Sequence, residues 1–337
     1  MNKKIKGIIL GTTILVATTI FIGCNKSPEN KIPEDKTKTE DTTDFKKFSY
    51  VYDNGKEKVD VDVVKAPKRA ITLSQFMTET LLALNLGDRM VGTALLDNPI
   101  LPQYKEAYDK IPVLKVTGGH DISKEAFMAL NPDFVSGWEM SINNESTGTP
   151  TELVKEGIYP FVDKALNGNA TIDTVYEDIT TLGKIFGVSN NAAEVITNMK
   201  NEVSKVEEKL KKIDNKDKAK VLIYDSGEKD AMVVGGGLPN NLIDLAGGKN
   251  IYGDLKKSYE TVSFESIVEK NPDIIIVTDY LAGKPVQDKI NFLKNNPALK
   301  DVNAIKNNNI KTIELADLSP GVRSAKAISE MNEMFYK

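Results

Sequence analysis

The chain has very little cysteine and histidine: its 337 residues include one of each, Cys24 and His120. A disulfide needs two cysteines, so a disulfide-stapled fold is excluded. Zinc and manganese sites draw on several imidazole or thiolate ligands, so a metal centre of that kind is excluded too. A nucleophilic triad could use only His120, and the sequence has no G-x-S-x-G motif. We therefore expect no enzyme, no resident metal and no cofactor.

The chain also lacks the excess of basic residues that a nucleic-acid-binding protein shows. It has 44 Lys+Arg residues against 48 Asp+Glu residues, a formal net charge of −4, so we expect no nucleic-acid partner. Residues 1–23 contribute three lysines and no acidic residue, so a chain cut after residue 23 is more acidic still. Such a chain has no general attraction for anionic ligands. An anionic ligand would need a local cation such as Arg323, one of only three arginines.

The N-terminus has the pattern of a secretory signal. Three lysines precede the uncharged, apolar run 7–25, which contains Gly23-Cys24 near its end. A small residue directly before a cysteine at this place resembles the lipobox of bacterial lipoproteins. The resemblance implies that residues 1–23 are removed and that the Cys24 thiol carries a lipid with acyl chains such as palmitate. The alternative is an uncleaved membrane anchor. Both interpretations place the rest of the chain outside the cytoplasm, because the lysines stay inside.

Residues 24–47 are predicted to form a solvated tether. The stretch from 25 to 44 has one Ile and no aromatic residue, so it cannot bury enough apolar surface to fold. Together with the strong excess of lysine over arginine, this favours a Gram-positive lipoprotein that is held at the cell membrane only by its lipid.

After the tether, short apolar runs alternate with helical patterns in two halves. A hairpin is predicted at 48–64, around the turn residues 53–55. Alternating strands and helices predict a mostly parallel α/β sheet in each half. Between the halves, apolar residues at helical spacing along 171–186 predict a stiff helix. The predicted strands are 69–74, 90–94, 113–116, 133–137, 159–162, 221–224, 231–234, 274–278 and 310–315, and the other predicted helices are 79–86, 124–130 and 191–212. We therefore divide the chain into an N-terminal lobe at 48–170, a connecting helix at 171–187 and a C-terminal lobe at 188–337.

An internal repeat links the two halves. The segments 123–135 and 263–275 both read S-x-E-x5-N-P-D followed by two apolar residues. The serine is a good helix N-cap, and the glutamate two residues later lies in the first helical turn. Asn-Pro-Asp then stops the helix and leads into a buried strand. Glu125 and Glu265 are thus either helix-stabilising residues or two equivalent carboxylates of a docking face.

These motifs together resemble those of the substrate-binding lipoproteins of ABC importers for iron-siderophores, heme and cobalamin. The resemblance runs from about residue 48 to residue 336. It is carried by 66–73, by 84–87 with 91–92, by both copies of the repeat, by 245–248 and by 320–323. It implies two Rossmann-like lobes joined by one rigid helix, with a ligand cleft between the lobes and little closure. It also implies that Glu125 and Glu265 pair with arginines of the permease.

Candidate ligand residues follow from a rule for open α/β sheets, whose ligands bind beyond the carboxyl ends of the strands. Trp138 is the only tryptophan of the chain, and an aromatic residue can pack a flat organic shell. Arg323 could pair with the oxygens of an anionic chelate. The candidates at predicted strand ends are Ser74, Gln75, Phe76, Trp138, Ser226, Tyr280 and Arg323.

The sequence leaves the ligand open. A ferric siderophore is the first expectation, and heme is a rival because His120 or Met77 could be an axial ligand. Cobalamin is a further alternative within the same importer type. An anchored enzyme and an adhesive lipoprotein are the other classes. The sequence has no G-x-S-x-G motif and no metal-ligand cluster to support the first, and the two-lobe repeat predicts a cleft that the second would not need. We expect a monomer whose partners are a small-molecule iron chelate, an ABC permease and its ATPase.

Overall fold

The computed structural model describes residues 45–211 and 218–336. The chain divides into two units, Met1–Thr42 and Thr43–Lys337, and the fold below belongs to the second unit. The predicted signal, Cys24 and most of the predicted tether therefore lie outside the described residues. Within the described ranges, none of the helices combines the length and the apolar character needed to span a bilayer.

The N-terminal lobe is built on a parallel sheet with the strand order β4-β3-β7-β8. The predicted hairpin is confirmed: β1 and β2 pair in antiparallel register from Phe48–Val63 to Asp53–Lys58. The elements are β1 Phe48–Asp53, β2 Lys58–Val63, β3 Ala70–Leu73, α1 Gln75–Ala83, β4 Met90–Thr93, α2 Lys105–Tyr108, β5 Val116–Gly118, β6 Asp121–Ile122, α3 Lys124–Ala129, β7 Phe134–Gly137, α4 Pro150–Lys155 and β8 Tyr159–Phe161.

The C-terminal lobe has a larger, mixed sheet in the order β12-β10-β9-β13-β14, with β11 also paired to β9. The strands β9, β13 and β14 run parallel, and β10 and β12 add an antiparallel edge. The elements are β9 Lys220–Ser226, β10 Ala231–Val234, α7 Gly237–Leu245, β11 Lys249–Asn250, β12 Tyr259–Val262, α8 Phe264–Lys270, β13 Ile274–Asp279, α9 Val286–Asn295, α10 Asn303–Lys306, β14 Ile310–Glu314 and α11 Ser324–Tyr336.

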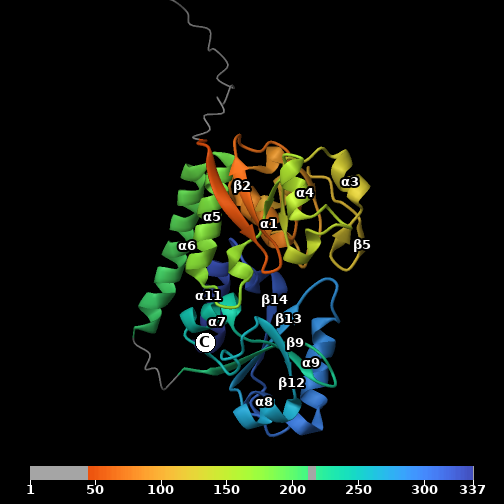
Figure 1. The fold of residues 1–337 in the computed structure, drawn as a ribbon. Coiled ribbons are helices and arrows are strands. Elements are labelled where there is room, and N and C mark those ends of the chain that lie inside the picture. The colour runs from red at the N-terminus through yellow and green to blue at the C-terminus, as the bar shows by residue number, and fades with distance from the viewer. Residues whose placement is uncertain (1–44, 212–217, 337) are drawn as a thin grey trace, which may run out of the picture. The chain divides into compact units, whose positions relative to one another are not determined.

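Two long helices lie between these sheets in the sequence, α5 Ile172–Phe186 and α6 Ser189–Leu210, and they run side by side (Figure 1). The predicted helix at 171–186 is confirmed, and its apolar stripe is buried. Gly187 ends α5 in the left-handed conformation, at φ +66°. The Ile172 N–H donates to Asn241 Oδ1 of α7, while the Phe186 ring packs on Phe134 of β7. Helix α5 therefore contacts the C-terminal lobe at its start and the N-terminal lobe at its end.

Alternation along the strands of the larger sheet divides the hydrophobic residues between two cores. Val221 and Ile223 of β9 belong to a core that continues through α5 and α6 into the N-terminal lobe. Leu222 and Tyr224 point to the opposite face, into a separate core that includes Phe264. A shared core favours a fixed arrangement of the two lobes, since close-packed interiors resist deformation.

Two predicted elements differ from the structure. Helix α1 starts at Gln75, not at residue 79, because the Ser74 hydroxyl accepts a hydrogen bond from the Met77 N–H and caps the helix. The predicted strand at 113–116 is wrong: Val113 makes one isolated bridge to Thr93, and the strand β5 begins at Val116. Val113 is 62% exposed, so its apolar character does not mark a buried strand here.

Candidate functional site

Parallel strands of the two sheets point their carboxyl ends at a contact between the lobes. Asp97 and Asn98 follow β4, and Asp279 ends β13. The Asn98 Nδ2 donates to the Asp279 carbonyl at 2.9 Å, and the Leu281 N–H donates to the Asp97 carbonyl at 2.8 Å. The Ala316 N–H, which follows β14, donates to Asn98 Oδ1 at 3.0 Å. The facing strand ends are the place where ligands of open α/β sheets bind.

The N-terminal side of this contact carries aromatic rings. The Trp138 ring meets the Phe76 ring edge to face, with the centroids 4.9 Å apart. The His120 ring is the second neighbour of Trp138, and the two ring centroids lie 6.1 Å apart. Gly137 precedes Trp138, and a Cβ at that position would lie 2.4 Å from the Leu73 carbonyl oxygen. The close approach of β3 and β7 therefore requires glycine and fixes where Trp138 leaves the sheet.

The C-terminal side carries tyrosines and carboxylates. Asp225, near the end of β9, accepts hydrogen bonds from the Thr278 hydroxyl at 2.8 Å and the Ser226 hydroxyl at 2.9 Å. Ser226 and Tyr280 line a pocket of about 400 Å³ on this lobe. Lys289 is buried beneath the Tyr280 ring: its Nζ lies 4.2 Å from the ring centroid and donates to the Thr278 carbonyl at 2.9 Å.

The two sides influence each other electrostatically. Burial, followed by the carboxylate of Asp225, raises the pKa of Tyr280, and Asp97 from the other lobe adds to the effect. Burial also raises the pKa of Tyr259, again with contributions from Asp225 and Asp97. The pKa of Asp97 is itself raised by burial, while His120 acts in the opposite direction. We call Phe76, Asp97, His120, Trp138, Asp225, Tyr259 and Tyr280 the interlobe cluster.

Arg323 does not lie open to a ligand in this structure. It is 2% exposed, and its guanidinium forms a two-pronged pair with Glu79 of α1, at 2.6 and 2.8 Å. It also pairs with Glu314 at 2.5 Å and with Asp317 at 3.2 Å, and it donates to the Pro99 carbonyl. The predicted ligand role of Arg323 stays a prediction, but its donors already serve an internal network between the lobes.

Gln75 and Ser74 belong to the same framework. The Gln75 Oε1 accepts hydrogen bonds from the N–H groups of Asp97 and Asn98, at 2.9 and 2.7 Å. Both Ser74 and Gln75 are buried, and Ser74 caps α1. The structure brings Phe76 and Trp138 together on one lobe and Ser226 and Tyr280 together on the other. Their roles in ligand binding, and those of Ser74 and Gln75, stay predictions.

Sequence reasoning missed Asp97, Asn98 and Asp225. Asp97 and Asn98 stand in the loop after β4, and Asp225 stands inside β9, whose predicted range stopped at residue 224. The loop after β4 was the available signal, because it leaves a parallel strand at the carboxyl edge.

The two glutamates of the repeat lie exposed on surface helices. Glu125 is in the first turn of α3, where the Ser123 hydroxyl donates to its carboxylate at 2.7 Å. This hydrogen bond lowers the pKa of Glu125. Glu265 occupies the equivalent turn of α8, after the N-cap Ser263. Their positions are compatible with a docking face, which stays a prediction.

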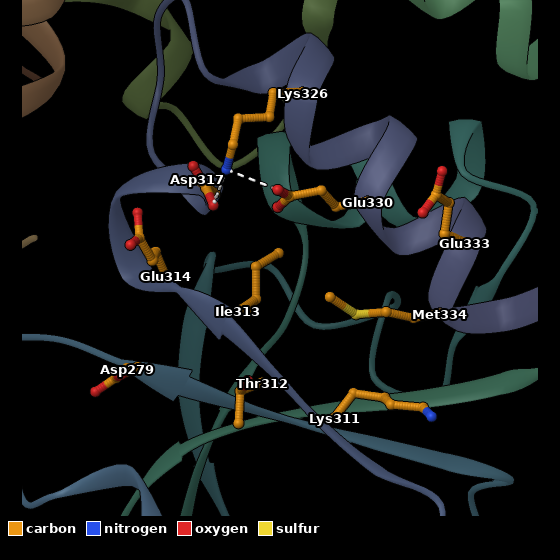
Figure 2. A pocket seen from close by; sticks show the side chains of 10 residues that line it. All are labelled: Asp279, Lys311, Thr312, Ile313, Glu314, Asp317, Lys326, Glu330, Glu333 and Met334. Carbon is orange, nitrogen blue, oxygen red and sulfur yellow. Dashed lines mark hydrogen bonds and ion pairs between the residues drawn. The ribbon is translucent and has the colours of Figure 1, made fainter. Parts of the chain in front are cut away.

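A second pocket, of about 630 Å³, lies beside β14 and α11 (Figure 2). Lys326 joins Asp317 at 2.8 Å and Glu330 at 2.9 Å across it. Its lining is Asp279, Lys311, Thr312, Ile313, Glu314, Asp317, Lys326, Glu330, Glu333 and Met334. None of the predicted ligand residues lies in this lining, so it does not coincide with the interlobe cluster.

Among the described residues, no group of three or more His, Cys, Asp and Glu side chains is arranged to hold a metal ion. Of the two candidate heme ligands, Met77 is fully buried in the hydrophobic core, whereas His120 is exposed beside Trp138. His120 is therefore the candidate that lies at the interlobe cluster.

Comparison with known proteins identifies the family to which this architecture belongs. Residues 71–315 match the periplasmic binding protein family. The chain is 26% identical to the uncharacterized ABC transporter substrate-binding lipoprotein YvrC of Bacillus subtilis, over 99% of this chain and 98% of that one. A periplasmic binding protein of Veillonella parvula superposes with a TM-score of 0.80 at 30% identity, covering 86% of this chain and 98% of that one. A possible iron-binding protein of Staphylococcus epidermidis gives 0.66 at 26% identity, over 81% of this chain and all of that one. The matched proteins are binding proteins and not enzymes, and the chain belongs to the periplasmic binding protein family, with two α/β lobes as the sequence predicts.

Proposed function

We propose that this protein is the extracytoplasmic, lipid-anchored solute-binding protein of an ABC importer, and that its cargo is an iron chelate. The observation that carries the proposal is the contact between the lobes at the carboxyl ends of parallel strands, where the Asn98 amide donates to the Asp279 carbonyl. Tyr280 directly follows Asp279 in the chain, and Phe76, whose ring packs on Trp138, directly follows Gln75, which accepts from the Asn98 N–H. Such side chains can pack the organic shell of a chelate, while polar neighbours fix its orientation.

The relatives support this class of cargo. The Staphylococcus epidermidis structure is described as a possible iron-binding protein. A Halobacterium salinarum relative, 28% identical over 62% of this chain and 53% of its own, is a cobalamin-binding protein. A Staphylococcus aureus relative, 26% identical over 55% of this chain and 65% of its own, belongs to a heme uptake system. Iron chelates, cobalamin and heme are all metal complexes in a large organic shell.

Heme is the second candidate, because His120 stands exposed beside Trp138. Its imidazole could reach an iron atom held against the indole ring. Met77 does not support this candidate, since it lies in the core.

The anchor and the docking face complete the proposal. Cleavage before Cys24 and lipidation of its thiol would hold the protein at the membrane, and the relative YvrC is named a lipoprotein. Glu125 and Glu265 would meet arginines of the permease, one from each lobe, with a charge-assisted hydrogen bond at each point.

Intrinsic fluorescence tests the cargo. Trp138 is the only tryptophan, so all indole emission reports on the interlobe cluster. We expect ferrichrome to quench the emission of the purified protein, while quenching by hemin or by cyanocobalamin alone would assign the cargo to one of the alternatives. Mass spectrometry of protein purified from its native membrane gives an independent readout. The absence of both a bound chelate and a fluorescence response to any probe would contradict the proposal.

A further inference from the structure

The interlobe cluster presents negative charge from both lobes. Asp97 extends from the N-terminal lobe, and Asp225 lies at the end of β9 in the C-terminal lobe. Hydrogen bonds bring both residues to the end of β13: the Thr278 hydroxyl donates to the Asp225 carboxylate, and the Leu281 N–H donates to the Asp97 carbonyl, each at 2.8 Å. Both carboxylates also contribute to the raised pKa values of Tyr259 and Tyr280. An anion placed there would be repelled by both aspartates, whereas a cation would be attracted.

One oxygen of this cluster lacks a partner. Asp97 Oδ2 is out of solvent contact and has no hydrogen-bond partner among the described residues. An ionised oxygen that is buried without a donor is costly, and native proteins satisfy nearly all such atoms. A donor brought by a ligand, such as an ammonium or an amide N–H, would satisfy it.

The cations nearest to the predicted ligand residues are already engaged. Of the two lysines that line the pocket with Ser226 and Tyr280, Lys284 pairs with Glu228, and Lys289 donates to the Thr278 carbonyl beneath the Tyr280 ring. Arg323 is held by Glu79, Glu314 and Asp317. An anionic ligand would therefore have to break an existing ion pair or hydrogen bond before it gained a counter-charge.

We propose that the interlobe cluster selects a chelate with no net negative charge, and that a donor group of the ligand, preferably cationic, meets Asp97. This inference rests on the proposed function and specifies its cargo. Hydroxamate ligands balance the charge of ferric iron and leave a neutral complex, to which a free amine adds positive charge. Catecholate ligands leave the complex strongly negative, and heme carries two carboxylates. The proposal therefore favours hydroxamate-type chelates, or the uncharged cobalamin, over catecholates and heme.

A panel of probes tests the charge. Ferrioxamine B carries an ammonium group, ferrichrome is neutral, and ferric enterobactin and hemin are anionic. We expect Trp138 quenching with ferrioxamine B or ferrichrome, and at least about tenfold weaker binding of both anionic probes. Tighter binding of ferric enterobactin or hemin would overturn the inference while leaving the proposed function intact. If no probe of the panel and no cobalamin binds, the proposed function itself fails.

Two variants locate the effect. In the double variant Asp97→Asn with Asp225→Asn, we expect ferrioxamine B to bind about tenfold more weakly, while ferrichrome keeps its affinity. The Ser226 and Thr278 hydroxyls donate to different oxygens of Asp225, and asparagine keeps an acceptor oxygen for one of them. The matched control is Asp60→Asn, an exposed position on β2, which should leave both affinities unchanged. The double variant Asp97→Glu with Asp225→Glu keeps both negative charges, so it should keep its affinity for ferrioxamine B; a loss there too would show a structural effect and not an effect of charge. Equal losses for the two probes, or no loss for ferrioxamine B, would contradict the inference.

Discussion

The two lobes share one framework and differ at the edges that face each other. In each lobe a serine caps a short helix, Ser123 for α3 and Ser263 for α8. An asparagine then turns the chain at positive φ, 45° at Asn131 and 46° at Asn271. Next, Asp133 and Asp273 accept hydrogen bonds from backbone N–H groups at the start of β3 and β9. The repeat therefore performs the same structural work twice.

The facing edges show no such equivalence. The N-terminal edge carries the Phe76 and Trp138 rings, and the C-terminal edge carries Asp225 and the hydroxyl of Tyr280. Repeated positions fix the backbone within each lobe, and unrepeated positions stand where a ligand would bind. The difference teaches that the sequence repeat marks the scaffold, while the ligand residues must be sought where the repeat breaks down.

The largest expected effect comes from cutting the ion pair that joins the two edges. Arg323→Met should lower the free energy of unfolding by about 3–5 kcal/mol, because Glu79 would be left charged and buried without its partner. Urea unfolding at neutral pH measures the loss. Arg69→Met is the matched control: Arg69 is exposed and donates to the Leu130 and Asn131 carbonyls, so we expect a cost of about 1 kcal/mol. Similar costs for the two variants would contradict the large contribution expected of the buried Arg323–Glu79 pair.

Two buried carboxyl groups, Asp178 on α5 and Asp163 before it in the chain, should have a smaller, pH-dependent effect on the free energy of unfolding. Burial raises the pKa of Asp178 to about 7, and burial and Asp178 raise the pKa of Asp163. In the unfolded chain both groups titrate near the ordinary value of about 4. The folded state therefore binds their protons more tightly, so their stabilising effect is present at acidic pH and is lost as the pH rises toward about 7.

Replacing the Asp178 carboxyl group with an amide should therefore stabilise the fold at higher pH. Asp178→Asn keeps an oxygen for the Ala165 N–H, and it should raise the free energy of unfolding by about 1–3 kcal/mol at a pH near 8, with little change near pH 4. Asp173→Asn, exposed on the same helix, is the control and should show neither change. An unchanged pH profile in the Asp178 variant would contradict the assignment.

The smallest expected effect tests the equivalence of the lobes directly. Ser123→Ala and Ser263→Ala each remove a helix N-cap, and each should cost about 1 kcal/mol in the free energy of unfolding. Amide hydrogen exchange in α3 and α8 would show where the loss occurs. A cost at one position and none at the other would break the equivalence that the repeat predicts.

Local patterns predict most of the framework, whereas long-range partners lie beyond them. The hairpin, α5 and both copies of the repeat follow from turn residues, helical spacing and caps. The engagement of Arg323 could not be foreseen, because Glu79 lies 244 positions away in the chain. The strand-end rule predicts ligand roles for Gln75 and Ser74, but it could not foresee that both are buried, with Ser74 capping α1 and Gln75 accepting from the loop after β4. The raised pKa values of Asp163 and Asp178 could not be predicted either, because burial causes them and the sequence pattern does not show that these two residues are buried.

We propose that the repeated glutamates contact the permease and that the unrepeated edges contact the ligand. The most direct test compares two measurements on Glu125→Ala with Glu265→Ala: cellular uptake of the probe that quenches Trp138, and the dissociation constant of the purified variant for that probe. Glu156→Ala with Glu269→Ala, which also removes one exposed glutamate per lobe, is the control. We predict that uptake falls to background in the first variant, while its dissociation constant and both properties of the control stay unchanged. Normal uptake in the first variant, or an affinity that falls together with uptake, would contradict the account.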